Sequence, residues 1–191
     1  MSQTRKKMMK SFPFDKSWTL FLDRDGVMNE RIVDGYIMNF EEFIPVPNLL
    51  DALHIFKRVF GDIFVVTNQQ CIGKGLCTEQ DIIRIHAQLN DLLLKEKILI
   101  TDFLYCPHKA SDQCHCRKPK PGMALQALEK HPQIDFSKSV MVGDMFSDIL
   151  FGRNLGMITV YVGEKDHPEY QQIAETADYI FDSIYDFALQ I

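Results

Sequence analysis

Short apolar runs alternate along the chain with longer segments in which apolar residues recur at helical spacing. Six of the runs have the length of a β-strand: residues 18–22, 62–66, 101–105, 139–142, 158–162 and 178–181. The first run is apolar at almost every position, which is typical of a strand buried on both faces of a parallel sheet. A half-exposed strand would instead alternate apolar and polar residues. The pattern therefore predicts buried, parallel strands.

The segments between these runs carry the start and stop signals of helices. Apolar residues over Leu49–Phe60 predict a helix that Gly61 ends, and Thr78 is a favourable N-cap for a second helix. We interpret His86, on the apolar face of that second helix, as a packed helix residue. Pro121 and the glycine after it begin a third helix. Because the connections are too long for hairpins, the alternation predicts a doubly wound, mostly parallel α/β sheet with helices on both faces, a Rossmann-like architecture.

The chain divides into a short arm and one domain. Residues 1–17 contain five basic side chains and lack the apolar stretch of a signal peptide, so we expect a flexible basic arm. Residues 18–191 are expected to form a single domain. The segment between Gly26 and Thr67 has room for one loop and one helix, which leaves none for a large cap domain. The loop at residues 29–42 should therefore help to shape the pocket, and a small substrate or a protruding phosphate is favoured.

Composition limits the possible partners. The 191 residues are 46% hydrophobic and 25% charged, as in an ordinary globular protein. The net charge of -5 disfavours a nucleic-acid-binding function, because that affinity depends on a basic surface. No apolar run approaches the roughly 20 residues of a membrane span. We expect a cytoplasmic monomer that binds neither nucleic acid nor membrane.

Acidic and polar side chains follow three of the predicted strands. They are Asp23 and Asp25 after the first strand, Thr67 and Asn68 after the second, and Asp144 after the fourth. Open parallel sheets have their ligand sites at the carboxyl ends of the strands, so these residues should lie close together. Two carboxylates spaced i, i+2 beside a glycine can hold a divalent cation next to a nucleophilic oxygen.

A run of cysteine and histidine residues predicts a zinc site. Its ligands are Cys106, His108, Cys114 and Cys116. Four protein ligands leave no open position for a water nucleophile, so the zinc is expected to stabilise its loop rather than to catalyse. His115 is an alternative ligand. Cys71 and Cys77 lie outside this run, and we interpret them as ordinary free thiols, because their spacing matches no redox motif.

The order of these motifs resembles that of the phosphatases of the haloacid dehalogenase (HAD) superfamily. The resemblance covers Asp23 to Asp148 and consists of Asp-x-Asp, Thr-Asn, a lysine at Lys118, and Gly-Asp. The cysteine-rich run leads directly into Arg-Lys-Pro-Lys-Pro-Gly at residues 117–122. This combination is similar to the zinc-loop branch of the superfamily, which contains phosphatases of heptose bisphosphate and of histidinol phosphate.

The resemblance implies a magnesium site and a covalent mechanism. Mg²⁺ would bind Asp23, the carbonyl of Asp25, and Asp144. Asp23 would attack phosphorus and become a phosphoaspartate, and Asp25 would donate a proton to the leaving oxygen and later accept one from water. Lys118 would supply a compact positive charge beside the nucleophile.

Further residues are expected to bind the substrate or to support the site. Thr67 and Asn68 offer donors to phosphoryl oxygens, and Arg117 and Lys74 could contact a second phosphate. Each of them could instead be a structural turn residue or a solvated loop residue. Asp148 is expected to support Lys118 or the metal waters, with a plain helix-surface carboxylate as the alternative.

The resemblance favours a magnesium-dependent phosphomonoester hydrolase that takes the 7-phosphate from D-glycero-D-manno-heptose 1,7-bisphosphate, with histidinol phosphate as the alternative substrate. Its partner is then a small phosphorylated sugar or related metabolite. Two departures bear on the sugar: Gln70-Cys71-Ile72 stands where the family usually has Ser-Gly-Ile, and Met145 stands where it usually has lysine. A phosphoacceptor receiver is disfavoured, because it needs neither Asp25 to hydrolyse the intermediate nor a zinc loop. A non-catalytic zinc module that binds nucleic acid is disfavoured by the acidic net charge.

Overall fold

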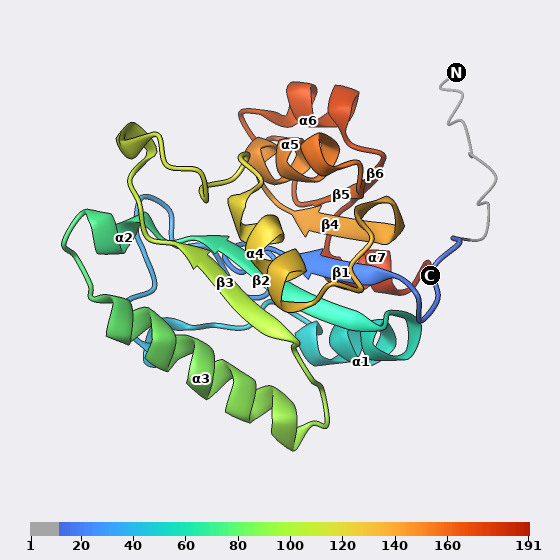
Figure 1. The fold of residues 1–191 in the computed structure, drawn as a ribbon, viewed down its shortest axis with the longest axis horizontal. Coiled ribbons are helices and arrows are strands. Elements are labelled where there is room, and N and C mark those ends of the chain that lie inside the picture. The colour runs from blue at the N-terminus through green and yellow to red at the C-terminus, as the bar shows by residue number, and fades with distance from the viewer. Residues whose placement is uncertain (1–11) are drawn as a thin grey trace.

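The computed structural model describes residues 12–191, which fold around one β-sheet (Figure 1). The six strands have the spatial order β3-β2-β1-β4-β5-β6, and every neighbouring pair is parallel. They are β1 (Thr19–Leu22), β2 (Asp62–Asn68), β3 (Asp102–Cys106), β4 (Ser139–Gly143), β5 (Ile158–Val162) and β6 (Tyr179–Phe181). The predicted parallel sheet is confirmed.

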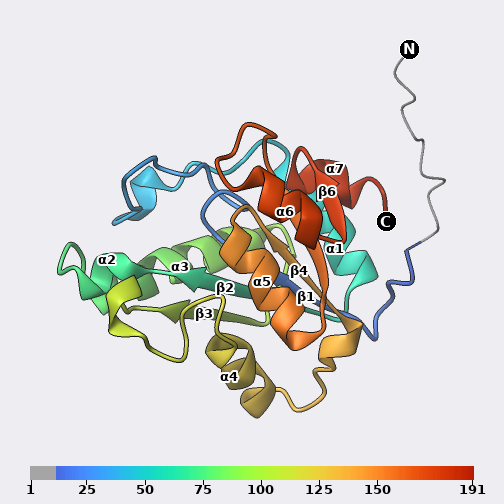
Figure 2. The ribbon, with the colours of Figure 1, turned by 90° about the horizontal axis from the view of Figure 1, so that it is seen from above.

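Helices cover both faces of the sheet. One face packs against α1 (Leu49–Val59), α3 (Glu79–Lys95) and α7 (Ile184–Ala188), and the other against α4 (Gly122–Lys130), α5 (Phe146–Leu155) and α6 (Tyr170–Thr176). In Figure 2, α3 and α4 lie on opposite sides of β2 and β3. The remaining helices are the single turn α2 (Gln70–Gly73) and the 3₁₀ turns Phe40–Glu42, Ala110–Asp112 and Phe136–Lys138. The fold is thus the doubly wound α/β type that the sequence predicts.

The strand order reverses between β1 and β4, which are neighbours at the centre of the sheet. From β1 the chain moves outward to β2 and β3, and from β4 it moves outward in the other direction to β5 and β6. At such a reversal the connections leave the carboxyl edge in opposite directions and open a crevice where ligands bind. Asp23 and Asp144 directly follow β1 and β4, so both lie at this crevice.

Alternate side chains of β1 belong to two separate cores. Leu20 and Leu22 pack with α1, α3 and α7, whereas Phe21 packs on the opposite face against Phe64 of β2. The rings of Phe21 and Phe64 are stacked with centroids 5.2 Å apart. Burial of each such side chain contributes roughly 2 kcal/mol. The strand that carries Asp23 is therefore held from both faces.

Most element boundaries agree with the sequence signals. Thr78 and Asp81 form the capping box of α3, each side chain accepting a hydrogen bond from the other residue's backbone N–H. Gly156, with φ +75°, ends α5 in the left-handed conformation. The sequence did not predict α2 or α6. The latter buries a single residue, Ile173, so it has no apolar periodicity to detect.

The expected basic arm is only partly described, because residues 1–11 lie outside the described residues. Residues 12–17 pack against the domain. The Phe14 ring lies 5.0 Å from that of Trp18 and 5.4 Å from that of Phe60, centroid to centroid. Lys16 donates a hydrogen bond of 2.8 Å to the Phe60 carbonyl. The packed domain thus includes residues before the expected boundary at residue 18.

The chain between β1 and β2 contains no cap domain. Its regular elements are one 3₁₀ turn and α1, joined by loop. The crevice above β1 and β4 is therefore bordered by the loop at residues 29–42 and by the cysteine-rich loop after β3. Within residues 12–191, none of the helices has the length and hydropathy needed to cross a bilayer.

Candidate active site

Lys118 lies between two carboxylates at the carboxyl end of β1. Its Nζ forms ion pairs of 2.8 Å with Asp23 Oδ1 and with Asp148 Oδ1, and it donates a hydrogen bond of 2.6 Å to the Val66 carbonyl. All three charged side chains are buried. The predicted contact of Asp148 with Lys118 is confirmed, and the alternative of a helix-surface carboxylate is wrong. Two ion pairs and one hydrogen bond thus hold the ammonium group in place.

Burial and the neighbouring opposite charges shift the pKa values of Asp23 and Lys118 in opposite directions. Burial raises the pKa of Asp23 to about 6, although the charge of Lys118 lowers it. Burial would lower the pKa of Lys118, but the Asp148 and Asp23 carboxylates outweigh that effect and raise it. Lys118 is therefore a charged ammonium in direct contact with the oxygen that is predicted to attack phosphorus.

Asn68 fixes the backbone of Lys118. The Asn68 side chain accepts a 3.0 Å hydrogen bond from the Lys118 N–H and donates one of 3.3 Å to the Lys118 carbonyl. The two bonds connect the end of β2 to a residue 50 positions later in the chain. Asn68 was predicted to bind substrate, and it lines the cleft, but the contact that it makes here is with Lys118.

Asp25 accepts hydrogen bonds from three side chains that the sequence reasoning missed. Arg24 Nη2 lies 2.9 and 3.0 Å from the two carboxylate oxygens, Asn29 Nδ2 lies 3.0 Å from Oδ1, and Gln69 Nε2 lies 2.9 Å from Oδ2. Burial would raise the pKa of Asp25, but Arg24 and these amide donors outweigh it and lower the pKa. Asp25 is held ionised. The detectable signal was Arg24 itself, a cation between the two aspartates that follow an apolar strand.

His86 of α3 contacts Arg24 and so extends the buried hydrogen-bond network around Asp25. Its Nε2 lies 3.3 Å from Arg24 Nη1, and its ring is stacked on Phe103 with centroids 5.1 Å apart. Burial, with a further contribution from the Arg24 charge, lowers the pKa of His86 to about 3. The ring is therefore neutral, and Nε2 accepts the hydrogen bond from Arg24. The interpretation of His86 as a packed helix residue is confirmed.

Asp144 faces Asp23 across the crevice and is paired with an arginine that the sequence did not indicate. Arg31 Nη2 is 2.8 Å from Asp144 Oδ1 and 3.2 Å from the Asp25 carbonyl oxygen. Burial raises the pKa of Asp144 well above its ordinary value, although the Arg31 guanidinium lowers it. Gly26 has φ +90°, and a Cβ there would overlap the Asp144 carboxylate. Only glycine leaves room for this side chain.

Three carboxylates form what we call the carboxylate cluster: Asp23, Asp144 and Asp148. They offer oxygen atoms within 4.8 Å of one another. Hard oxygen donors, here the carboxylates and the backbone carbonyl of Asp25 beside them, are the ligands that Mg²⁺ prefers. The guanidinium nitrogen of Arg31 already bridges two of the predicted ligand oxygens, so the position attracts a cation. The donor set fits magnesium.

A cleft lies over this cluster. Its lining includes the predicted residues Asp23, Asp25, Thr67, Asn68, Arg117 and Lys118, together with Arg31, Tyr36 and Met145. Nη1 of Arg117 is buried and has no hydrogen-bond partner among the described residues. Lys74 is not part of this lining. Its Nζ instead donates a 2.7 Å hydrogen bond to the Tyr36 hydroxyl, so its predicted substrate contact stays a prediction.

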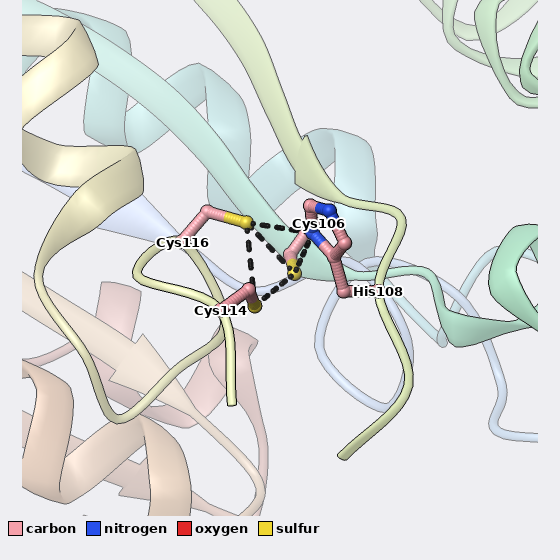
Figure 3. Close-up of side chains that lie close together, drawn as sticks. All are labelled: Cys106, His108, Cys114 and Cys116. Atoms are coloured by element: carbon pink, nitrogen blue, oxygen red, sulfur yellow. Dashed lines mark hydrogen bonds between the residues drawn. The ribbon is translucent and has the colours of Figure 1, made fainter. Parts of the chain in front are cut away.

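The four predicted zinc ligands lie together at the end of β3 (Figure 3), and we call them the Cys–His cluster. Cys106 Sγ is 3.0 Å from Cys116 Sγ and 3.5 Å from Cys114 Sγ, and His108 Nδ1 is 3.2 Å from Cys116 Sγ. Zinc bound to sulfur at about 2.3 Å requires sulfur atoms about 3.8 Å apart. The separations are close to that value, and the soft donors fit zinc. His115, the alternative ligand, is not one of the four residues of this cluster.

Lys118 lies in the chain close to the Cys–His cluster. Cys106 ends β3, the loop folds back on itself, and Lys118 follows Cys116 by two residues. Lys120 Nζ donates 2.8 Å hydrogen bonds to the carbonyls of Gln113 and Cys114, which closes the loop further. A group that holds the three cysteines therefore also holds Arg117 and Lys118 at the cleft.

Comparison with known proteins agrees with this geometry. A family model described as HAD-hydrolase-like matches residues 115–187. The D-glycero-alpha-D-manno-heptose-1,7-bisphosphate 7-phosphatase of Mycobacterium tuberculosis H37Rv is 37% identical over 179 residues, which covers 91% of each chain. The corresponding beta-heptose enzyme of Pseudomonas putida is 34% identical over 167 residues, 86% of this chain and 94% of its own.

Solved structures show the same fold. The D,D-heptose 1,7-bisphosphate phosphatase of B. bronchiseptica, complexed with magnesium and phosphate, superposes with a TM-score of 0.78 at 24% identity and covers 91% of this chain and 97% of its own. The Burkholderia thailandensis enzyme superposes with a TM-score of 0.61 at 22% identity, covering 90% and 96%.

The fold, the site and these matches together identify the chain as a HAD-like phosphatase. The extent and identity of the sequence matches narrow this further. The chain belongs to the family of D-glycero-D-manno-heptose-1,7-bisphosphate 7-phosphatases.

Proposed function

We propose that the chain is a magnesium-dependent phosphomonoester hydrolase that acts through a phosphoaspartate on Asp23 and removes the 7-phosphate of D-glycero-D-manno-heptose 1,7-bisphosphate. The observation that carries this proposal is the buried contact of Lys118 with Asp23, beside Asp144, at the strand reversal. A nucleophilic carboxylate, a fixed ammonium group and a second carboxylate are the minimum set for phosphoryl transfer to a side chain. The names of the relatives support the sugar.

Charge neutralisation is the main task of the site. A phosphate dianion repels an anionic nucleophile, so positive charge must be in place before attack. The Lys118 ammonium contacts Asp23 directly and is held by Asp148 and the Val66 carbonyl. Mg²⁺, when held by Asp23, the Asp25 carbonyl and Asp144, supplies further positive charge to the phosphoryl oxygens.

Asp25 is proposed to move the protons. Its three hydrogen-bonding partners, Arg24, Asn29 and Gln69, keep it ionised, which suits acceptance of a proton from the water that hydrolyses the phosphoaspartate. In the first half-reaction Asp25 must first take up a proton from solvent and then donate it to the leaving oxygen; the water that hydrolyses the phosphoaspartate returns that proton. The donation requires its carboxyl group to turn toward the cleft, away from some of these donors.

Arg117 and Thr67 are proposed to bind the substrate. Both line the cleft, and the buried Nη1 of Arg117 lacks a protein partner among the described residues, so it is available for an anionic oxygen. The Cys–His cluster is proposed to hold zinc and to fix Arg117 and Lys118 in place. With no cap domain over the cleft, the body of the sugar remains partly exposed. A protruding phosphate is thus the part that the site recognises.

The test is a phosphate-release assay with purified protein. The substrates are the alpha and beta anomers of the heptose bisphosphate and histidinol phosphate, each with Mg²⁺ and with the metal chelated. We expect kcat/KM for one heptose anomer to exceed that for histidinol phosphate by at least about 100-fold, and activity to disappear with chelation. Equal or faster hydrolysis of histidinol phosphate would reject the proposed sugar. Release from no substrate by zinc-loaded protein would reject the catalytic proposal itself.

A further inference from the structure

The guanidinium of Arg31 occupies the position between two oxygen atoms that are proposed to bind magnesium. One nitrogen, Nη2, donates to Asp144 Oδ1 at 2.8 Å and to the Asp25 carbonyl at 3.2 Å. A bound divalent cation would take both of these oxygens at about 2.1 Å. The arginine and the metal therefore compete for the same pair of acceptors.

Electrostatics explains why a cation is held there. Asp144 is a largely buried carboxylate, and burial alone strongly disfavours its charge. Lys118 is committed to Asp23 and Asp148, and Arg24 to Asp25. Among the described residues, Arg31 is the cation that is paired with Asp144. Its guanidinium offsets the charge that a metal would otherwise offset.

The position of Arg31 in the chain allows its side chain to leave without unfolding the site. The backbone on either side of the loop is anchored, because Asn29 is fully buried and the Glu30 N–H donates a 2.8 Å hydrogen bond to the Ile44 carbonyl. The Arg31 side chain, by contrast, is 39% exposed, against 13% for Asp144. The loop that follows contributes Ile32 and Tyr36 to the cleft. A displaced guanidinium would thus remain over the substrate site.

We propose that Arg31 is an exchangeable counter-cation of the magnesium site: Mg²⁺ displaces its guanidinium from Asp144 and the Asp25 carbonyl, and the displaced group then binds a phosphate oxygen in the cleft. The inference rests on the proposed function, because it requires the magnesium site. Positive charge is conserved near Asp144 throughout, first from the arginine and then from the metal. The arginine is released toward the anion that arrives next.

The test is the Mg²⁺ affinity of the purified protein, measured by isothermal titration calorimetry. The variants are Arg31→Met and Arg31→Lys. Methionine has nearly the length of the arginine stem and no oxygen, so tighter metal binding cannot come from a new ligand. Arg84→Met is the control, because Arg84 lies on the exposed face of α3 and its ion pair within residues 12–191 is with Asp81. We expect Arg31→Met to bind Mg²⁺ about tenfold more tightly than wild type, Arg31→Lys to be intermediate, and Arg84→Met to be unchanged.

The outcomes separate this inference from the proposed function. Wild-type affinity in Arg31→Met, with saturable binding that Asp144→Asn abolishes, would overturn the exchange and leave the metal site standing. Absence of saturable Mg²⁺ binding to wild type would overturn both. Should Arg31→Met fail to fold, Arg31→Lys decides alone, because a lysine reaches one of the two oxygens less well and should bind Mg²⁺ a few-fold more tightly.

The second half of the inference concerns the displaced guanidinium. With Mg²⁺ saturating, inorganic phosphate is titrated into wild type, Arg31→Met and Arg84→Met. Loss of one charge-assisted contact should weaken phosphate binding to Arg31→Met by about tenfold. Equal phosphate affinity in all three proteins would show that the displaced arginine does not reach the ligand, and would overturn this half.

Discussion

The carboxylate cluster and the Cys–His cluster both lie at the carboxyl edge of the sheet but are built in opposite ways. The Cys–His cluster draws its four ligands from eleven consecutive positions of one loop. The carboxylate cluster takes Asp23 from the end of β1 and, more than a hundred residues later, Asp144 from the end of β4 and Asp148 from the first turn of α5. One is specified by local spacing, and the other exists only once the sheet has formed.

The two clusters also differ in how their charge is balanced. The carboxylate cluster contains its own cations, since Lys118 and Arg31 pair with its members at 2.8 Å. Among the described residues, no lysine or arginine side chain donates a hydrogen bond to a side chain of the Cys–His cluster, and its thiols lie 3.0 to 3.6 Å from one another. Thiolates at such separations need a metal to offset their charge. We therefore expect the carboxylate cluster to be folded before its metal binds, and the zinc loop to depend on its metal for its shape.

The largest expected effect is on catalysis at the carboxylate cluster. Asp23→Asn keeps the shape of the side chain but removes the nucleophile, and Lys118 retains Asp148 and the Val66 carbonyl. We expect phosphate release to fall by at least about 1,000-fold while the melting temperature stays within about 3 °C of wild type. Asp91→Asn, on the exposed face of α3, is the control and should keep full activity. Turnover by Asp23→Asn within threefold of wild type would remove the covalent mechanism.

The same contrast explains how much the sequence could predict. Strand positions, Asp23, Asp144 and Lys118 followed from apolar runs that end in polar residues and from the motif order. The four members of the Cys–His cluster followed from spacing alone. All of these depend on local patterns or on the rule that places ligands at the carboxyl ends of strands.

The residues that were missed act across long sequence separations. Gln69 and Asn29 reach Asp25 from a turn and a loop, and neither differs from an ordinary polar residue in sequence. Arg31 reaches Asp144, 113 positions away, only because β1 and β4 are adjacent. Lys74 donates a hydrogen bond to the Tyr36 hydroxyl, a partner that its sequence position did not indicate, and its substrate contact stays a prediction. Direction of a long side chain is set by its tertiary neighbours, which no local pattern encodes.

A smaller effect is expected when the Cys–His cluster is broken. Cys116→Ser removes one of four zinc ligands and should release the loop that holds Lys118. We expect the melting temperature to fall by about 6–12 °C, for a loss of about 3 kcal/mol in a domain of this size. Bound zinc, measured by plasma mass spectrometry, should fall with it, and phosphate release should fall at least about tenfold.

The matched control is Cys77→Ser, a half-buried cysteine that lies outside the Cys–His cluster. It should keep its zinc and melt within about 2 °C of wild type. Zinc-free wild-type protein that melts at the same temperature as the zinc-loaded protein would contradict the dependence of the loop on its metal. The contrast with the self-compensated carboxylate cluster would then be lost.

The smallest expected effect concerns His86, the buried residue that contacts the Arg24 partner of Asp25. His86 is buried and neutral, with its pKa lowered from 6.5 to about 3 by burial and by Arg24. The unfolded chain binds a proton at this residue below pH 6.5 and the folded chain does not, so stability is lost as pH falls through that range. Between pH 7 and pH 5.5 this contributes about 1 kcal/mol, or about 2–4 °C in melting temperature.

His86→Gln keeps an oxygen that can accept a hydrogen bond from Arg24 but does not titrate, so its melting temperature should fall less over the same interval. His54→Gln, whose ring is 33% exposed, serves as the control and should retain the wild-type slope. An identical slope in His86→Gln and wild type would mean that protonation of His86 is not resisted by the fold, and that the compensation of charge around Asp25 ends at Arg24.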